Sequence, residues 1–291
     1  MPNLHFFRYL STALLGGLLI SLSSLALARD EAIATLDWTV AETLVVLGSP
    51  PQGVAQIDAY HAWVQAPALP ESITDLGLRA QPNLERLAAL APDRILITPM
   101  FANLTPQLQR IAPVEMLELY RPEHETWQEI LRLTRELGTL LKREEAAERM
   151  IENTELHLAT LRQRLPANLA PILIVQFIDA RHVRIFAGNS LYQAVVTQLG
   201  LDNAWQEKTN AWGFSLVALE RLATIDARLV VVEPYPVGVE ERLADSGLWQ
   251  HQPSVRNESW VVLPPVWSFG ALPSARRFAE QLVTALSEES P

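Results

Sequence analysis

Residues 142–165, KREEAAERMIENTELHLATLRQRL, form the segment around which the rest of the chain is organised. They include neither Gly nor Pro, and most have high helix propensity. Glu144 and Glu145 lie in its first turn, arginines lie near its end and Pro166 follows it, as expected of a helix with a sharp stop. The spacing of four and three residues predicts one helix of roughly 34 Å with a narrow, mainly apolar stripe formed by Ala147, Ile151, Thr154, Leu158, Leu161 and Leu165.

The flanks of this helix separate two interpretations, a rigid connector and an ordinary surface helix or short coiled coil. On both sides, short β-rich runs alternate with helical ones, which is typical of parallel or mixed sheets covered by helices. Before it we predict strands at 32–36, 53–56, 95–98 and 114–117 and helices at 40–47, 84–90 and 126–141. After it we predict strands at 172–178, 183–186, 229–233 and 260–263 and helices at 191–199, 219–225 and 274–286.

One unit occurs on each side of the connector. LERLAAL at 84–90 leads into RILI at 94–97, and LERLATI at 219–225 leads into RLVV at 228–231. Chance reuse of a common amphipathic pattern is the alternative explanation. We predict an α/β fold of two Rossmann-like lobes, residues 29–141 and 166–291, joined by the helix 142–165, with a ligand cleft between the lobes.

The N-terminus resembles a signal peptide. An uncharged stretch follows Arg8 and ends in Ala26-Leu27-Ala28, directly before charged residues. We therefore expect residues 1–28 to be cleaved and the mature chain to begin near Arg29; an uncleaved membrane anchor is the alternative, because 20 residues can span a bilayer. This predicts export to the periplasm of a Gram-negative bacterium.

Composition excludes several classes of protein. Only Arg8 of the 23 basic residues precedes Arg29, so the mature chain has 22 basic and 33 acidic residues, a net charge of −11. This charge argues against nucleic acid and anionic membranes as partners. With no Cys there is no disulfide, thiolate metal site, cysteine nucleophile or lipidation site.

The eight tryptophans fall into two groups. Trp127, Trp249 and Trp260 lie in helical or strand patterns and are predicted to be core residues. The others lie beside turn-forming or polar neighbours and are predicted to line the cleft, although each could instead fill a gap beneath a loop. These five are Trp38, Trp63, Trp205, Trp212 and Trp267.

Arg79 is the candidate polar anchor. It lies in a short loop ahead of a helix, without an acidic neighbour within three residues. A solvated surface charge is the ordinary interpretation of such a residue. Beside an aromatic wall, however, its planar guanidinium suits the oxygen atoms of an anion or a metal chelate.

Enzyme and metal signatures are missing from the sequence. It has no HExxH, GxSxG, GxGxxG or Walker A pattern, and the histidines of the mature chain are single and scattered. We expect no catalytic residues and no cofactor; metal binding by ligands distant in sequence stays open.

Three runs together resemble the periplasmic ferric-hydroxamate siderophore-binding proteins of ABC-type iron uptake, which are class III periplasmic binding proteins. The runs are 78–85 (LRAQPNLE), 203–213 (NAWQEKTNAWG) and 264–271 (PPVWSFGA), and 178–182 and 186–191 fit the same family. The resemblance covers essentially the whole mature chain. It implies two lobes joined by one long helix, with a ferrichrome-like iron(III) hydroxamate in a shallow aromatic cleft, its iron held by the siderophore and not by protein ligands.

The resemblance also implies individual roles. Arg79 would contact the hydroxamate oxygens, and the five cleft tryptophans would line the pocket. Phe101 and Phe269 stand where the family has Tyr, so part of the hydrogen bonding to hydroxamate is missing, at a cost of about 1 kcal/mol for each lost bond. Acidic residues of the family dock on the inner-membrane ABC permease, which works with a cytoplasmic ATPase; Glu220 fits this role in the second lobe and Gln107 stands at the first-lobe position, whereas Glu85 is expected to be an ordinary exposed residue.

Two other functions stay open. One is binding of another chelate, such as haem, cobalamin or a ferric catecholate, although catecholates call for several converging basic residues. The other is a periplasmic α/β enzyme that uses a loop carboxylate such as Asp179. We also expect a monomer, and only small lobe movements on binding, because a continuous helix has no flexible hinge.

Overall fold

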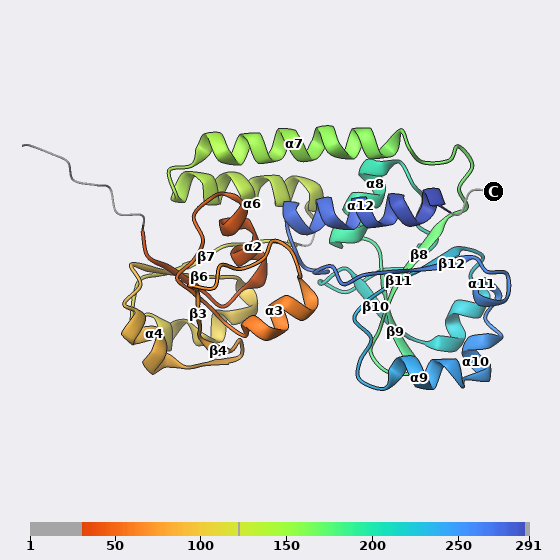
Figure 1. Cartoon of the computed structure of the whole chain (residues 1–291), viewed down its shortest axis with the longest axis horizontal. Coiled ribbons are helices and arrows are strands. Elements are labelled where there is room, and N and C mark those ends of the chain that lie inside the picture. The colour runs from red at the N-terminus through yellow and green to blue at the C-terminus, as the bar shows by residue number, and fades with distance from the viewer. Residues whose placement is uncertain (1–30, 122, 289–291) are drawn as a thin grey trace, which may run out of the picture. The chain divides into compact units, whose positions relative to one another are not determined.

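The computed structural model describes residues 31–121 and 123–288, in which two five-stranded sheets are flanked by helices (Figure 1). The first sheet is entirely parallel, in the order β3-β2-β1-β6-β7. Its strands are β1 (Ile33–Thr35), β2 (Gly53–Val54), β3 (Thr74–Asp75), β6 (Arg94–Ile97) and β7 (Val114–Met116). With it go a hairpin of β4 (Gly77–Leu78) and β5 (Gln81–Pro82) and the helices α2 (Trp38–Val46), α3 (Ile57–Trp63), α4 (Leu84–Leu90), η1 (Pro99–Leu104), α5 (Thr105–Leu108) and α6 (Thr126–Leu140). We call this the first lobe.

The second sheet has the order β10-β9-β8-β11-β12. Strands β8, β11 and β12 are parallel, and β9 runs antiparallel to both β8 and β10. The strands are β8 (Ile172–Phe177), β9 (His182–Phe186), β10 (Phe214–Ala218), β11 (Arg228–Val232) and β12 (Trp260–Leu263). The helices are α8 (Leu191–Leu199), η2 (Leu219–Thr224), α9 (Val239–Ala244), α10 (Gly247–Gln250), α11 (Pro253–Arg256) and α12 (Leu272–Glu288). This is the second lobe.

One long helix, α7 (Glu144–Arg162), stands between the two sheets in the chain and packs against α6 and α12 (Figure 1). It is shorter than predicted at both ends, because Lys142 has a φ of 56° and Gln163 already forms the C-cap. The predicted stripe is confirmed for Ala147, Ile151, Thr154, Leu158 and Leu161, all of which are buried. Leu165 lies beyond the helix and is half-buried.

A single apolar core connects both sheets with this helix. It contains Ile33 and Leu96 of the first sheet, Ile174 and Val230 of the second, and Leu158 of α7. Separate clusters fill the opposite face of each sheet. The expected fold class, two Rossmann-like α/β lobes joined by one long helix, is confirmed.

Some elements differ from expectation. Residues 219–225 are predicted as a helix like 84–90, but 219–224 form the 3₁₀ helix η2, whereas 84–90 form an α-helix as predicted. Strand β10 and the short helices α9 and α11 were not predicted. The predicted signal peptide lies outside the described residues; in the part that is described, no helix is long and apolar enough to cross a membrane.

Candidate functional site

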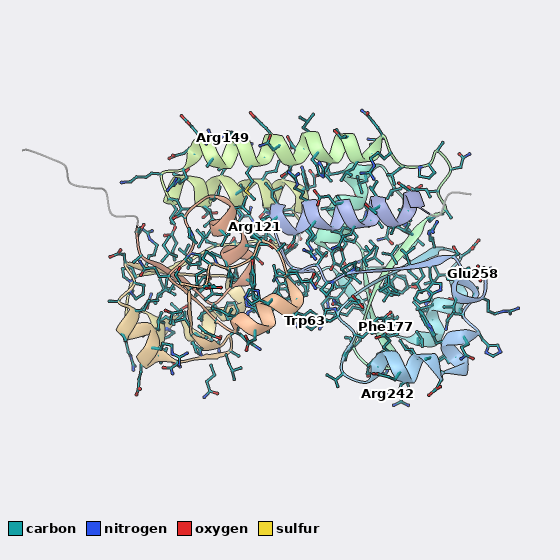
Figure 2. The ribbon with its side chains drawn as sticks, viewed as in Figure 1. Trp63, Arg121, Arg149, Phe177, Arg242 and Glu258 are labelled. Carbon is teal, nitrogen blue, oxygen red and sulfur yellow. The ribbon has the colours of Figure 1, made fainter. Side chains whose placement is uncertain are left out.

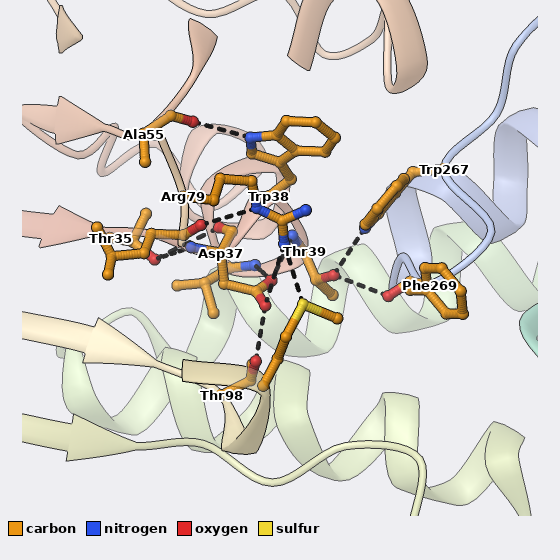
Figure 3. A network of polar contacts seen from close by, with 12 residues as sticks. Thr35, Asp37, Trp38, Thr39, Ala55, Arg79, Thr98, Trp267 and Phe269 are labelled. Atoms are coloured by element: carbon orange, nitrogen blue, oxygen red, sulfur yellow. Dashed lines mark hydrogen bonds and ion pairs between the residues drawn. The ribbon is translucent and has the colours of Figure 1, made fainter. Parts of the chain in front are cut away.

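The guanidinium of Arg79 is enclosed by aromatic rings. Arg79 lies in the tight turn between β4 and β5, and its side chain reaches back into the first lobe. Its Cζ lies 4.2 Å from the ring centroid of Trp38, 5.1 Å from that of Phe101 and 5.3 Å from that of Trp267. The structure therefore brings four of the predicted site residues together in one cation–π cluster. Figure 3 shows Arg79 between Trp38 and Trp267.

Polar contacts fix the direction of this guanidinium (Figure 3). Nε donates to the Leu36 carbonyl at 3.1 Å, and Nη2 lies 3.8 Å from Oδ2 of Asp37 and 3.7 Å from Sδ of Met100. Burial lowers the pKa of Arg79, and the Asp37 carboxylate partly restores it. With only 13% of its side chain exposed, Arg79 is a held charge and not a solvated one.

Asp37 is a site residue that the sequence did not reveal. It is the N-cap of α2, and its Oδ1 accepts from the backbone N–H of Thr39 at 2.8 Å. Its Oδ2 accepts from Oγ1 of Thr98 at 2.7 Å, in the loop after β6. The carboxylate thus joins the carboxyl ends of β1 and β6, where ligands of parallel sheets bind. A capping Asp before an apolar helix was the available signal, but its partnership with Arg79 depends on the fold.

Two aromatic residues from the chain after β12 complete this side of the site. We call residues 264–271 the strap, because they leave the second sheet and bind to the first lobe. Nε1 of Trp267 donates to Oγ1 of Thr39 at 3.1 Å, and Oγ1 of Thr39 donates to the Phe269 carbonyl at 2.7 Å. The ring centroids of Trp267 and Trp38 are 4.9 Å apart. The strap therefore places a second-lobe tryptophan against the first-lobe cluster.

A buried carboxylate anchors the end of the strap. Glu42 of α2 is fully buried and accepts from the backbone N–H of Ala271 at 2.7 Å and from Oγ of Ser274 at 2.5 Å. The hydroxyl of Tyr120 donates to the Gly270 carbonyl. Gly270 is required here, because a Cβ at this position would lie 2.7 Å from Oε1 of Glu42 and 2.2 Å from Oγ of Ser274.

A cleft opens beside the cluster. It measures about 380 Å³, counting the space at its open mouth. The ring of Trp212, which is 40% exposed, meets Phe269 edge-on at 5.9 Å between centroids. The cleft has one polar edge, formed by Asp37, Thr39 and Thr98, and its other walls are mainly apolar and aromatic. These walls are lined by Pro99, Met100, Leu119, Tyr120, Trp212, Trp267 and Phe269.

A larger groove lies between α7 and α12, with a volume of about 1150 Å³. Its lining includes Arg149, Arg276 and Arg277 but no aromatic ring. Arg149 and Arg276 pair with Glu145 and Glu280 of their own helices, and Arg277 contacts Gln65. We assign the functional site to the smaller cleft, because aromatic rings line it and the buried Arg79 guanidinium packs against one of them, that of Trp267.

The two remaining predicted cleft tryptophans, Trp63 and Trp205, do not line the cleft. Trp63 is the last residue of α3, half-buried against the cluster that contains Trp38 (Figure 2). Trp205 is only 5% exposed; it packs in the core on the far face of the second sheet, and Nε1 donates to Oγ of Ser215. The structure thus places Trp63 next to the cluster and does not bring Trp205 to it.

The tryptophans predicted to be core residues are confirmed as such. Trp127 and Trp249 are buried, and Trp260 is half-buried against the same cluster as Trp249. Trp38 and Trp63 are not loop residues as predicted, because they begin and end helices.

The residues considered for docking and catalysis lie away from this cluster. Gln107 on α5, Glu220 on η2 and Glu85 on α4 are exposed. Asp179 accepts from the backbone N–H groups of Arg181 and His182 in the β8–β9 turn. Within residues 31–121 and 123–288 no three His, Cys, Asp or Glu side chains are grouped as metal ligands would be.

The sequence of this chain is similar to those of known binding proteins. Residues 33–266 match the family model described as periplasmic binding protein. The chain is 34% identical over 256 residues to the iron(3+)-hydroxamate-binding protein FhuD of Escherichia coli K12, covering 87% of this chain and 86% of that protein. It is 27% identical to the achromobactin-binding periplasmic protein of Dickeya dadantii, with 84% and 82% covered.

A solved structure matches the whole fold. The siderophore-binding protein FhuD from Vibrio cholerae, crystallised with Fe³⁺–Desferal bound, superimposes with a TM-score of 0.86 at 29% identity, covering 90% of this chain and all of that one. The match extends over both lobes and the connecting helix, and the family model covers more than half of the sequence. This chain belongs to the periplasmic binding protein family.

Proposed function

We propose that this protein binds iron(III) hydroxamate siderophores in the periplasm and delivers them to an inner-membrane ABC permease. The observation that carries the proposal is the Arg79 guanidinium, held between three aromatic rings at the edge of an aromatic cleft. Two relatives with the same fold are named for binding ferric hydroxamate or Fe³⁺–Desferal. Similarity to binding proteins supports a role in which the ligand is bound and released without being converted.

The chemistry of the cleft suits such a ligand. A ferric hydroxamate presents oxygen atoms around the iron and an organic backbone outside them. Arg79 can donate to those oxygens through its terminal nitrogens, because Nε is already committed to Leu36. The rings of Trp212, Trp267 and Phe269 offer apolar area for the backbone. The siderophore then supplies the iron ligands.

Further parts of the proposal concern organisation and partners. Residues 29–141 and 166–291 act as the lobes of a monomer, and residues 142–165 connect them. Glu220 and Gln107 dock the two lobes on the permease, which the exposure of both side chains allows. Cleavage after Ala28 releases the mature protein into the periplasm.

Tryptophan fluorescence tests this proposal. Titration with ferrichrome or ferrioxamine B is expected to quench the emission of the wild type, because Trp38, Trp212 and Trp267 lie at the site. Arg79→Ala is expected to weaken binding by about tenfold or more, the effect of losing a charged hydrogen bond. Arg86→Ala is the matched control, since Arg86 lies on α4 and is exposed. Absence of quenching by any ferric hydroxamate would overturn the proposal.

A further inference from the structure

A second arginine, Arg184 on β9, lies near the cleft in the other lobe. In the register of β8, β9 and β10, Ile174 lies opposite Phe186, and Phe186 opposite Phe214; the next row consists of Gln176, Arg184 and Leu216. Ile174 and Phe186 belong to the shared core, but Leu216 is 60% exposed. This row is exposed only at its end on the edge strand β10, because Gln176 at the other end is buried.

Among the described residues, no acceptor lies within hydrogen-bond distance of the Arg184 guanidinium, and no carboxylate lies within 4 Å. Its Nε is buried and unpaired, as is Oε1 of the neighbouring Gln176. The ring of Phe214 packs against the guanidinium, with its centroid 5.0 Å from Cζ. Partial burial lowers the pKa of Arg184, the expected result of desolvating a cation without a counter-ion.

The position of Arg184 connects it with the candidate site. The ring of Phe214 lies 6.4 Å from that of Phe269, and Phe269 and Trp212 both line the cleft. Arg184 thus stands one aromatic ring behind the cleft lining, on the second-lobe side. Arg79 lies on the first-lobe side of the same aromatic surface, 5.3 Å from the centroid of Trp267, which packs on Phe269.

We propose that Arg184 is a second cation of the ligand site and binds a carboxylate carried by the siderophore, while Arg79 contacts the oxygens around the iron. This inference rests on the proposed function and narrows the ligand class. A guanidinium binds a carboxylate through two parallel hydrogen bonds, which would supply both the missing acceptors and the missing charge. A neutral ferric trihydroxamate leaves Arg184 desolvated without compensation. The site therefore prefers ferric hydroxamates that bear a peripheral carboxylate.

A matched pair of ligands tests the preference. Desferrioxamine B has one terminal amine, which can be capped with an acetyl group, giving a neutral iron complex, or with a succinyl group, giving the same complex with a carboxylate. Binding of both complexes is measured by tryptophan quenching for the wild type, Arg184→Gln and Arg184→Lys. Arg242→Gln is the control, because Arg242 lies exposed on α9 of the same lobe and its loss changes the net charge equally.

The expected result is a change in the ratio of the affinities for the succinyl and acetyl complexes. The wild type and Arg242→Gln should bind the succinyl complex about tenfold more tightly than the acetyl complex. Arg184→Gln should lower that ratio to near one by losing succinyl affinity only, and Arg184→Lys should keep part of the preference because it retains the charge. A ratio near one in the wild type, or an unchanged ratio in Arg184→Gln, would overturn the role of Arg184. Failure of both complexes to bind the wild type would instead overturn the proposed function.

Discussion

At the scale of single residues, the site is built by desolvating a cation and restraining it. Three aromatic rings take Arg79 out of water, which disfavours its charge, and Asp37 offsets part of that cost from 3.8 Å. Because Asp37 is itself fixed by Thr98 and by the first turn of α2, the guanidinium is restrained before the ligand arrives. Restraint of this kind lowers the entropic cost of binding.

Phe101 offers a direct test at this scale. Its ring packs 5.1 Å from Cζ of Arg79, and its side chain has no hydrogen-bond donor. Phe101→Tyr adds a hydroxyl next to the residue that grips the hydroxamate oxygens, so we expect affinity for ferric hydroxamates to rise about fivefold, the value of roughly 1 kcal/mol for one hydrogen bond. Fluorescence titration measures the change. Phe177→Tyr in the second-lobe core is the control, and equal affinities of Phe101→Tyr and the wild type would contradict the prediction.

The sequence indicated the residues of the cation–π cluster but not the charged residues that lie near them. Arg79 and Trp267 were recognisable because they lie in runs that resemble the family. Trp38 was singled out by its polar neighbour, and Phe101 by the family position that it occupies. Asp37 and Arg184 were not, because Asp37 acts on a residue 42 positions away and Arg184 sits in an alternating strand pattern. Trp205 had the same local signal as Trp212, yet packing on the far sheet face buries it.

At the scale of elements, a strong periodicity of apolar residues predicted the type of secondary structure correctly, and a weak periodicity did not. The stripe of α7 has one interpretation, and its five buried positions follow the sequence. Residues 219–224 share the pattern of α4 but form a 3₁₀ helix, and local composition does not separate these two geometries. Strand β10 is short and only half-buried, and it was missed because cross-strand pairing with β9, which the sequence does not show, defines it.

The junction of α2 with α12 predicts a pH dependence of stability. Burial raises the pKa of Glu42 from its ordinary value of 4.5 to about 8, although hydrogen bonds from Ser274 and Ala271 oppose this. A raised carboxyl pKa means that the folded state keeps a proton that the unfolded state releases. The contribution of Glu42 to the free energy of unfolding is therefore fully present below pH 4.5. It is lost as pH rises toward 8, at on the order of 1 kcal/mol per pH unit.

Urea unfolding between pH 5 and pH 8 measures this loss. Glu42→Gln keeps the shape and an acceptor for the Ala271 N–H but cannot ionise, so its free energy of unfolding should fall less steeply over that range. Glu152→Gln changes an exposed carboxylate on α7 and should retain the wild-type slope. Parallel slopes for Glu42→Gln and the wild type would show that Glu42 does not carry this dependence.

At the scale of the whole molecule, the connections between the lobes limit their motion. Both sheets contribute to one core around α6, α7, α8 and α12. The strap adds further connections: Thr39 and Tyr120 of the first lobe donate hydrogen bonds to the chain leaving the second sheet, and Glu42 accepts one from it. The sequence predicted a stiff connector from α7 alone, but the strap could not be foreseen, because its partners are some 150 to 230 residues apart.

Small-angle scattering tests the resulting rigidity. A chain of about 260 residues has a radius of gyration near 18 Å, and wide closure of two lobes would change it clearly. Because α7 has no internal break and the strap holds Trp267 and Phe269 on the first lobe, we expect the free and ferrichrome-loaded proteins to differ by less than about 5%. Glu42→Leu removes the acceptor for Ala271 and Ser274 and should widen that difference by freeing the end of the strap. A large contraction of the wild type on loading would show that the lobes hinge despite these contacts, and that the aromatic wall is assembled by the ligand instead of being present before it binds.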